Sequence, residues 1–315
     1  MRARSLAVRV AVVAVLFAAV VVLVAQLVPG AERRLADAQA GWLAVAVAAE
    51  VLACAGYAVL FHAVFSRPPH TVPAVRSAQI AVGELAGYAI VPTGVGGPAL
   101  RFWALRRGGM PWRPIAVSTV AHAPLFNIPY LVAAVALGVG VAVGVAPGHA
   151  PLLVALAPTG VVLVVLLAAL AVVAAARPRR AGRVRDALRI GADGIRQVPS
   201  LARRPATLAG AFGFWAGDCA ALVAAFHACG GDPAIAIVVL AYMLGQLGNL
   251  LPLPGGIGGV EPVMLGVFAA SGVSTGLAAA AIVCYRAIAL GIQGLAGTAA
   301  AVALAHDLRA ASSAS

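Results

Sequence analysis

The sequence predicts an all-α polytopic membrane protein: an inverted repeat of two units, with six transmembrane helices and two opposed re-entrant helical hairpins. Composition, the length of the apolar runs and a repeated proline- and glycine-rich motif predict this fold class. Of 315 residues, 63% are apolar and only 10% are charged, and the mean hydropathy is +1.01. Soluble domains are nearer to half apolar and a quarter charged. The composition therefore suits lipid as the solvent, and we treat residues 1–315 as a single membrane domain.

Six apolar runs are long enough to cross a bilayer, which takes about 20 helical residues. The first run is too long for the apolar core of a secretory signal and has no clear small-residue cleavage pattern after it, so we interpret it as a retained helix. The six runs cover residues 6–28, 41–65, 115–146, 151–176, 206–228 and 276–305.

The arginines predict the orientation, because basic loops stay on the cytoplasmic side. All 22 basic residues are arginines, and nine of them lie in a basic loop at residues 177–204. This distribution places that loop and both termini in the cytoplasm. The net charge of +12 also raises the possibility of nucleic acid, but the arginines lie between apolar runs and leave no soluble face for a duplex. We expect no nucleic-acid partner.

The basic loop carries apolar residues at helical spacing, namely Val184, Leu188, Ile195 and Val198. One interpretation is a surface helix that lies on anionic headgroups. The other is a solvated basic loop, and the pattern favours neither.

Two shorter apolar segments precede turns rich in proline and glycine. Residues 77–91 lead into PTGVGGP (residues 92–98), and arginines follow on both sides of this unit. A stretch of 15 residues is too short for a crossing, so the chain is expected to enter the membrane, turn and leave on the same side. Residues 234–251, the turn PLPGGIGG (residues 252–259) and residues 260–270 predict a second hairpin of the same kind.

The chain aligns with itself at an offset of 162 residues. Residues 83–97 then match residues 245–259 at six of fifteen positions, and the spans 41–65 and 115–146 fall on further predicted spans. Each unit is span, span, hairpin, span, and the first starts inside whereas the second starts outside. Such inverted repeats with broken segments are typical of transporters with a midplane site. The two units cover about residues 6–146 and 151–305.

The turn glycines have two interpretations. They would let the hairpin tips bend tightly, so that the helix beginning at each tip presents N–H donors to an anion such as a lipid phosphate. Alternatively, they only permit close helix packing. They are Gly94, Gly96, Gly97, Gly255, Gly256, Gly258 and Gly259.

Ionisable residues in predicted membrane segments are costly and usually face the bundle interior. We expect two ion pairs, Glu84 with Arg101 and Glu261 with Arg286. The pairs either only lock the hairpins, or an arginine binds a headgroup phosphate while a carboxylate exchanges a proton.

Asp218 and Glu50 have no obvious partner in the sequence, which makes them candidates for proton coupling. Asn249 is a candidate substrate-binding residue. With Asn127, Gln246 and His122 it would line the substrate path, although each is more often an ordinary interior polar residue.

Catalysis is not expected. The four cysteines and six histidines are too dispersed for a metal site, no soluble segment is long enough for a catalytic domain, and the glycine turns lack the strand and lysine of a phosphate loop. We therefore expect no catalytic residue, no metal and no cofactor, and a protein that is not an enzyme.

The segments LGQLGNLLPLPGGIGGVEPVMLGVF (residues 244–268) and YRAIALGIQ (residues 285–293) resemble the membrane region of lysylphosphatidylglycerol synthases and their stand-alone, flippase-like relatives. VPTGVGGPALRFWALRRGGMP (residues 91–111) is similar to the family's earlier turn. The resemblance implies a polytopic protein of the bacterial inner (cell) membrane. In multiple peptide resistance factor members this region is assigned the flipping of aminoacylated lipid between leaflets. Those members add an aminoacyl transferase, which this sequence does not contain, so the lysyl-lipid substrate is not carried over.

We therefore expect a protein that translocates an anionic lipid or lipid-linked headgroup by alternating access, with membrane lipids as its partners. The alternative is a non-transporting partner or anchor of a separately encoded transferase. A channel is less favoured, because no ring of charge or filter-like run of carbonyls is evident. The sequence leaves the oligomeric state open.

Overall fold

The structure is a computed structural model that describes residues 28–90, 95–175, 182–250 and 256–313. Within these ranges the regular elements are helices, and the one strand-like contact is an isolated bridge between Arg67 and His70. The predicted all-α class is confirmed for this part of the chain. The predicted span 6–28 lies outside the described residues except for its last position.

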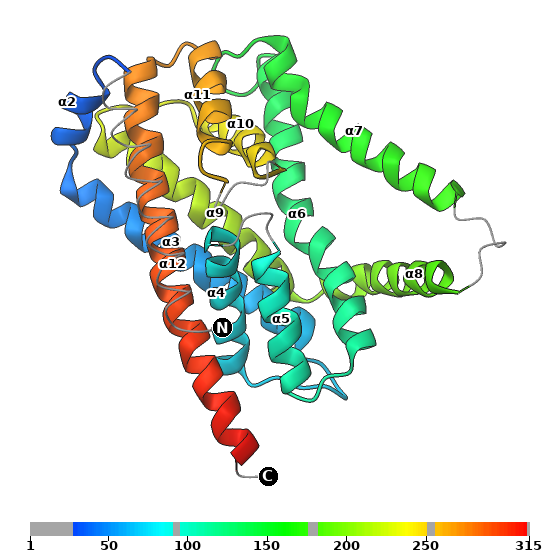
Figure 1. Cartoon of the computed structure of the whole chain (residues 1–315). Coiled ribbons are helices and arrows are strands. Elements are labelled where there is room, and N and C mark those ends of the chain that lie inside the picture. Colours follow the sequence, from blue (N-terminus) through cyan, green and yellow to red (C-terminus); the bar gives the residue numbers. More distant parts are fainter. Residues whose placement is uncertain (1–27, 91–94, 176–181, 251–255, 314–315) are drawn as a thin grey trace.

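Figure 1 shows the helices in chain order, and four of them are long and apolar enough to cross a membrane: α3, α6, α9 and α12. The predicted total of six spans is not established by these four and stays a prediction. The elements are α2 (Ala31–Ala36), α3 (Ala40–Phe65), α4 (Ala74–Ile90), α5 (Gly96–Arg107), α6 (Trp112–Ala142), α7 (Leu152–Ala175), α8 (Arg183–Ala202), α9 (Pro205–Ala228), α10 (Ile235–Gln246), η2 (Leu247–Leu250), α11 (Val260–Ala270) and α12 (Thr275–Ser313).

Two predicted span boundaries are wrong. The helix predicted over residues 115–146 ends at Ala142, where the chain turns through Gly144 at a φ of 77°. The last helix continues beyond the predicted residue 305 to Ser313. Hydropathy detects only the apolar part of a helix, so it stops short where the last turns become polar.

Two pairs of short helices lie between the long helices. α4 packs on α5, and α10 packs on α11. In Figure 1 the first pair lies in the lower half of the view and the second in the upper half. A 12-residue helix such as α5 or α10 is about 18 Å long, well short of the roughly 30 Å hydrocarbon core. Most of each connecting turn, residues 91–94 and 251–255, lies outside the described residues.

The crossing of α3 and α9 is the most extensive helix contact in the described chain, and glycines make it close. A Cβ atom on Gly210 would lie 2.5 Å from the Leu60 nitrogen and 2.8 Å from the Gly56 oxygen. Only glycine permits backbones to approach that closely. One buried apolar cluster surrounds α10 and α11, and a second surrounds α4 and α5.

The basic loop contains α8, so the solvated-loop interpretation is wrong for residues 183–202. α8 packs on α6, and Arg67 Nη2 donates to Gln197 Oε1 at 2.8 Å. Burial and the nearby Arg204 lower the pKa of Arg67. Ile195, on the predicted apolar face, is exposed, so part of that face has no protein partner among the described residues.

Candidate functional site

A cavity of about 450 Å³ lies between the two hairpins. Residues of α3, α6, α9 and α12 line it together with residues of α4, α5, α10 and η2, so both predicted units contribute to its wall. Five predicted site residues reach it: Arg101, Asp218, Asn249, Gly256 and Arg286.

The first predicted ion pair is present. Arg101 of α5 lies 3.2 Å from Glu84 of α4, and the two side chains are 7% and 0% exposed. Tyr88 also donates to Glu84 Oε1 at 3.2 Å, and the Arg101 guanidinium lies 5.4 Å from the centre of the Phe65 ring. The hairpin arms are therefore joined by a buried charge pair, and Arg101 and Tyr88 face the cavity.

The second predicted ion pair is present as well. Arg286 Nε of α12 lies 2.8 Å from Glu261 Oε1 of α11. The Gly258 N–H donates to the other oxygen, Glu261 Oε2, at 2.7 Å. A carboxylate thus already occupies one N–H of the second hairpin tip, in the position that we predicted for a ligand anion. Arg286 lines the cavity, whereas Glu261 does not.

Asp218 and Glu50 do have partners, which corrects the expectation drawn from the sequence. Gln293 of α12 donates to Glu50 Oε1 at 2.8 Å, and Tyr242 of α10 donates to Asp218 Oδ2. The two carboxyl groups, on α3 and α9, also interact with each other. Asp218 is 4% exposed and lines the cavity, whereas Glu50 is fully buried behind it.

The turn glycines divide between the two interpretations. Gly97 is a packing glycine, since a Cβ there would lie 2.7 Å from the Tyr88 ring and 2.8 Å from Glu84 Cγ. Gly259 likewise packs directly on Gly248. Gly256 and Gly258 serve the turn, with φ values of 68° and 83°.

Two of the remaining turn glycines cannot be assigned in this way. Gly94 and Gly255 lie outside the described residues. Gly96, at the start of α5, lies directly against Gly87 of α4, which fits packing.

The uncharged polar residues of the predicted path gather at the cavity. His122 and Asn127 reach it from α6, and Gln246 and Asn249 reach it from the end of the second hairpin's first arm. Asn249 Nδ2 donates to Gln246 Oε1 at 2.6 Å. These contacts place the four side chains on the wall, while their binding of a substrate stays a prediction.

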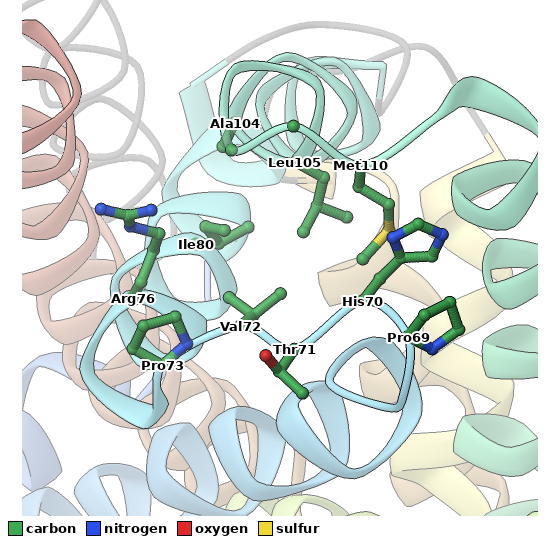
Figure 2. A pocket seen from close by; sticks show the side chains of 12 residues that line it. Pro69, His70, Thr71, Val72, Pro73, Arg76, Ile80, Ala104, Leu105 and Met110 are labelled. Atoms are coloured by element: carbon green, nitrogen blue, oxygen red, sulfur yellow. The ribbon is translucent and has the colours of Figure 1, made fainter. Parts of the chain in front are cut away.

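A second cavity of about 190 Å³ lies between the α3–α4 connection and the α5–α6 turn. Figure 2 shows Arg76 and His70 on opposite sides of it, with Val72, Ile80 and Leu105 between them. None of the predicted site residues lines this cavity, and we assign it no part in the site.

The chain was compared with known families and proteins. The family model of the lysylphosphatidylglycerol synthase transmembrane region matches residues 6–297. The chain belongs to this family. The family and the four long apolar helices make it an integral membrane protein linked to lipid metabolism or translocation. A search of curated proteins found no match.

The wall of the 450 Å³ cavity includes two polar residues, Tyr242 and Gln293, to which the sequence analysis gave no role. Gln293 follows Arg286 by seven residues, two helical turns, and therefore lies on the same face of α12. Tyr242 precedes Gln246 by four residues, a spacing that would have placed it on the same face as this predicted path residue. Helical spacing of polar residues inside apolar runs is the signal that could have found them.

Aromatic side chains form much of the cavity wall, and the sequence analysis assigned them no role. Trp215 stacks on Tyr130 with ring centres 4.1 Å apart, and its Nε1 donates to the Phe126 carbonyl at 2.6 Å. The aromatic residues on the wall are Tyr57, Tyr88, Phe126, Phe214, Trp215, Tyr242 and Tyr285. They make the wall both apolar and rigid beside a few polar groups, as is usual for a small-molecule site.

Proposed function

We propose that this family member translocates an anionic lipid, or a lipid-linked anionic headgroup, between the leaflets of the bacterial inner membrane by alternating access. One observation carries the proposal: Arg101 from the first unit and Arg286 from the second face one cavity. The guanidinium group suits phosphate, since its donors match two phosphate oxygens at once. In this proposal the chain has no catalytic chemistry of its own.

The cavity volume suits a headgroup rather than a whole lipid. Sites for small ligands measure roughly 300–1,000 Å³, and this cavity measures about 450 Å³. Phosphate and glycerol fit within that volume, whereas two acyl chains do not. The chains would stay in the surrounding bilayer while the headgroup passes through the protein.

The inverted repeat gives such a site its two access states. Four features support the repeat: the order long helix, two short helices, long helix occurs twice, in α3–α6 and in α9–α12. Each pair of short helices has its own apolar cluster. α4 packs on α12, and the element at the matching place, α10, packs on α6. The motif at residues 83–97 recurs at residues 245–259.

α6 offers a place for movement beside the cavity. Pro124 and Pro129 lie within this helix, and each removes one backbone hydrogen bond and weakens the helix locally. Phe126 and Asn127, between the two prolines, line the cavity. In this proposal α6 bends there when access changes from one leaflet to the other.

Reconstitution tests the proposal. Phosphatidylcholine vesicles would contain the protein and a tail-labelled fluorescent probe, either phosphatidylglycerol, phosphatidylserine or a polyprenyl phosphate, with labelled phosphatidylcholine as the neutral comparison. A membrane-impermeant quencher reports the fraction of probe in the outer leaflet. We expect faster exchange of at least one anionic probe, and a loss of about tenfold or more in Arg286→Ala. Unchanged exchange of every anionic probe contradicts the proposal.

The inverted arrangement has its own test, on a variant without the native cysteines. Thr71 and Asp232 are exposed residues in matching connections of the two units, before α4 and before α10. A cysteine at Thr71 should react with an impermeant maleimide from the cytoplasmic side only, and one at Asp232 from the outside only. Labelling of both from one side rules out inversion.

A further inference from the structure

The charges around the cavity do not balance for an anionic cargo. Four carboxyl groups and two guanidinium groups are buried or nearly buried at or behind its wall in the described chain. With His122 neutral, the form normally present above pH 7, full ionisation leaves two uncompensated negative charges. A lipid phosphate would add a third in a region where an unpaired charge is costly. The six residues are Glu50, Glu84, Arg101, Asp218, Glu261 and Arg286.

Two of the four carboxyl groups are already neutralised. Glu84 is paired with Arg101 and Glu261 with Arg286, at 3.2 Å and 2.8 Å. The excess negative charge therefore belongs to Glu50 and Asp218. These two groups act on each other electrostatically across the α3–α9 crossing. The backbones beside them are close, since a Cβ on Gly217 would lie 2.7 Å from the Ala49 carbonyl oxygen.

The hydrogen bonds of this pair leave one oxygen of each carboxyl group available for a proton. Gln293 donates to Glu50 Oε1 and Tyr242 donates to Asp218 Oδ2. The other oxygens, Glu50 Oε2 and Asp218 Oδ1, are buried and have no hydrogen-bond partner among the described residues. The Tyr285 hydroxyl of α12 also acts on the Asp218 carboxyl group. Two adjacent carboxylates repel each other strongly, and a proton on either group removes that repulsion and supplies the missing donor.

We infer that this protein couples translocation to protons: Glu50 and Asp218 together take up one proton when the anionic headgroup enters the cavity. The inference rests on the proposed function and names its driving ion. The proton comes from water in the cavity and forms an O–H bond on Asp218, which lines the wall, and Glu50 behind it shares this proton. It returns to water when the headgroup leaves on the other side. One proton and one singly charged lipid then cross together without net charge.

The surroundings of the pair connect it to the second hairpin. Glycine contacts at Gly56, Gly210 and Gly217 hold α3 and α9 together. The backbone segments that carry the two carboxyl groups are therefore fixed relative to each other. Their donors come from α10 and α12, which contact α11 of the second hairpin. Movement of that hairpin would thus change the hydrogen bonds of the pair. The titratable and charged groups that act on the pair from its own and neighbouring helices are Cys54, Tyr130, Cys219, Tyr242, Tyr285 and Arg286.

The experiment compares a pH gradient with a membrane potential. Vesicles of phosphatidylcholine with tail-labelled phosphatidylglycerol are given either an acid exterior or a potassium diffusion potential, and the quencher reports the steady-state share of probe in each leaflet. For one proton per lipid, one pH unit should change the leaflet ratio about tenfold. A potential of about 60 mV, which would change the ratio tenfold for an uncompensated charge, should have no effect.

Asp218→Asn and Glu50→Gln should reverse this behaviour, because an anion that crosses without a proton carries its charge. In these variants the leaflet ratio should follow the potential and ignore the pH gradient. Asp232→Asn is the matched control, since Asp232 lies in the exposed α9–α10 connection, and it should behave as the wild type.

The wild-type protein alone decides the inference if a variant fails to fold. A wild-type leaflet ratio that follows the potential, or a sodium gradient in place of the pH gradient, overturns proton coupling and leaves the proposed function standing. If wild type exchanges another anionic probe but no phosphatidylglycerol, the same gradients are applied with that probe, and the same two outcomes decide. Exchange of no anionic probe at all overturns the proposed function, and proton coupling with it.

Discussion

Replacement of Arg286 by methionine tests whether a buried charge pair holds the second hairpin against the last helix. Arg286 Nε lies 2.8 Å from Glu261 Oε1, and the side chains are only 8% and 12% exposed. Removal of one partner from a buried pair costs about 3–5 kcal/mol, because the other charge stays buried without compensation. The Gly258 N–H still donates to Glu261 Oε2. We therefore expect the lower end of that range, about 3 kcal/mol.

The double variant Arg286→Met with Glu261→Gln separates the pair from its parts. Glutamine keeps the shape of glutamate without its charge, so the double variant leaves no buried charge behind. The loss of stability in the double variant should be smaller than the sum of the two single losses by about 2 kcal/mol. Titration with sodium dodecyl sulfate in mixed micelles, followed by tryptophan fluorescence, measures the unfolding free energies.

Arg196→Met is the matched control for this cycle. Arg196 pairs with Asp193 at 3.5 Å on α8, but the side chains are 78% and 48% exposed. Exposed pairs contribute roughly 0–1 kcal/mol, so this variant should unfold like the wild type. Additive losses in the Arg286–Glu261 cycle, or an equal loss in Arg196→Met, would refute the reasoning.

Two further variants test the packing of the long helices. Gly210→Ala should destabilise the protein by about 2 kcal/mol or more, because the new Cβ would lie 2.5 Å from the Leu60 nitrogen. Gly191→Ala on α8 is the control, since a Cβ there has nothing within 4 Å. In the same titration it should be neutral or slightly stabilising. Cysteines at Gly83 and Ala301, whose Cβ atoms would be 3.5 Å apart, have a separation that suits a disulfide. Oxidation should join α4 to α12 and stop lipid exchange in vesicles, and a reductant should restore it; exchange that continues while the disulfide is shown to be complete would contradict movement between these helices.

The helical fold class, the two pairs of short helices and both ion pairs could be predicted from the sequence because each depends on local information. That the short pairs are re-entrant stays a prediction. A hairpin brings its own arms together, so Glu84 and Arg101 had to approach each other once the turn was recognised. The proximity of Glu50 and Asp218 depends instead on the rotation of α3 against α9, which pack closely at Gly217. In helices that are apolar on every side, hydropathy gives no preferred face, and the rotation could not be predicted.

The aromatic wall was missed for a related reason. Tyrosine, tryptophan and phenylalanine are common in apolar spans, where they pack, face lipid or line a site with equal ease. Tyr130 and Trp215 meet through the stacking of α6 on α9, two helices that lie far apart in the sequence. Only the arrangement of the long helices distinguishes a wall residue from a lipid-facing one.

The glycine contacts of the α3–α9 crossing would keep these two helices together during the proposed change of access. Backbone contact between α3 and α9 at Gly56 and Gly210 leaves no side chains that could rearrange, so sliding there would require the whole interface to separate. The two ion pairs lie elsewhere: Arg101 of α5 binds Glu84 of α4, and Arg286 of α12 binds Glu261 of α11. α4 also meets the backbone of α12 closely at Gly297. Ion pairs can exchange a carboxylate for a phosphate, since both are anions of similar hydrogen-bonding geometry. Headgroup entry at Arg101 or Arg286 would therefore loosen the hairpin whose carboxylate it replaces while the α3–α9 crossing stays intact. This is how binding at a fixed site would open one face at a time.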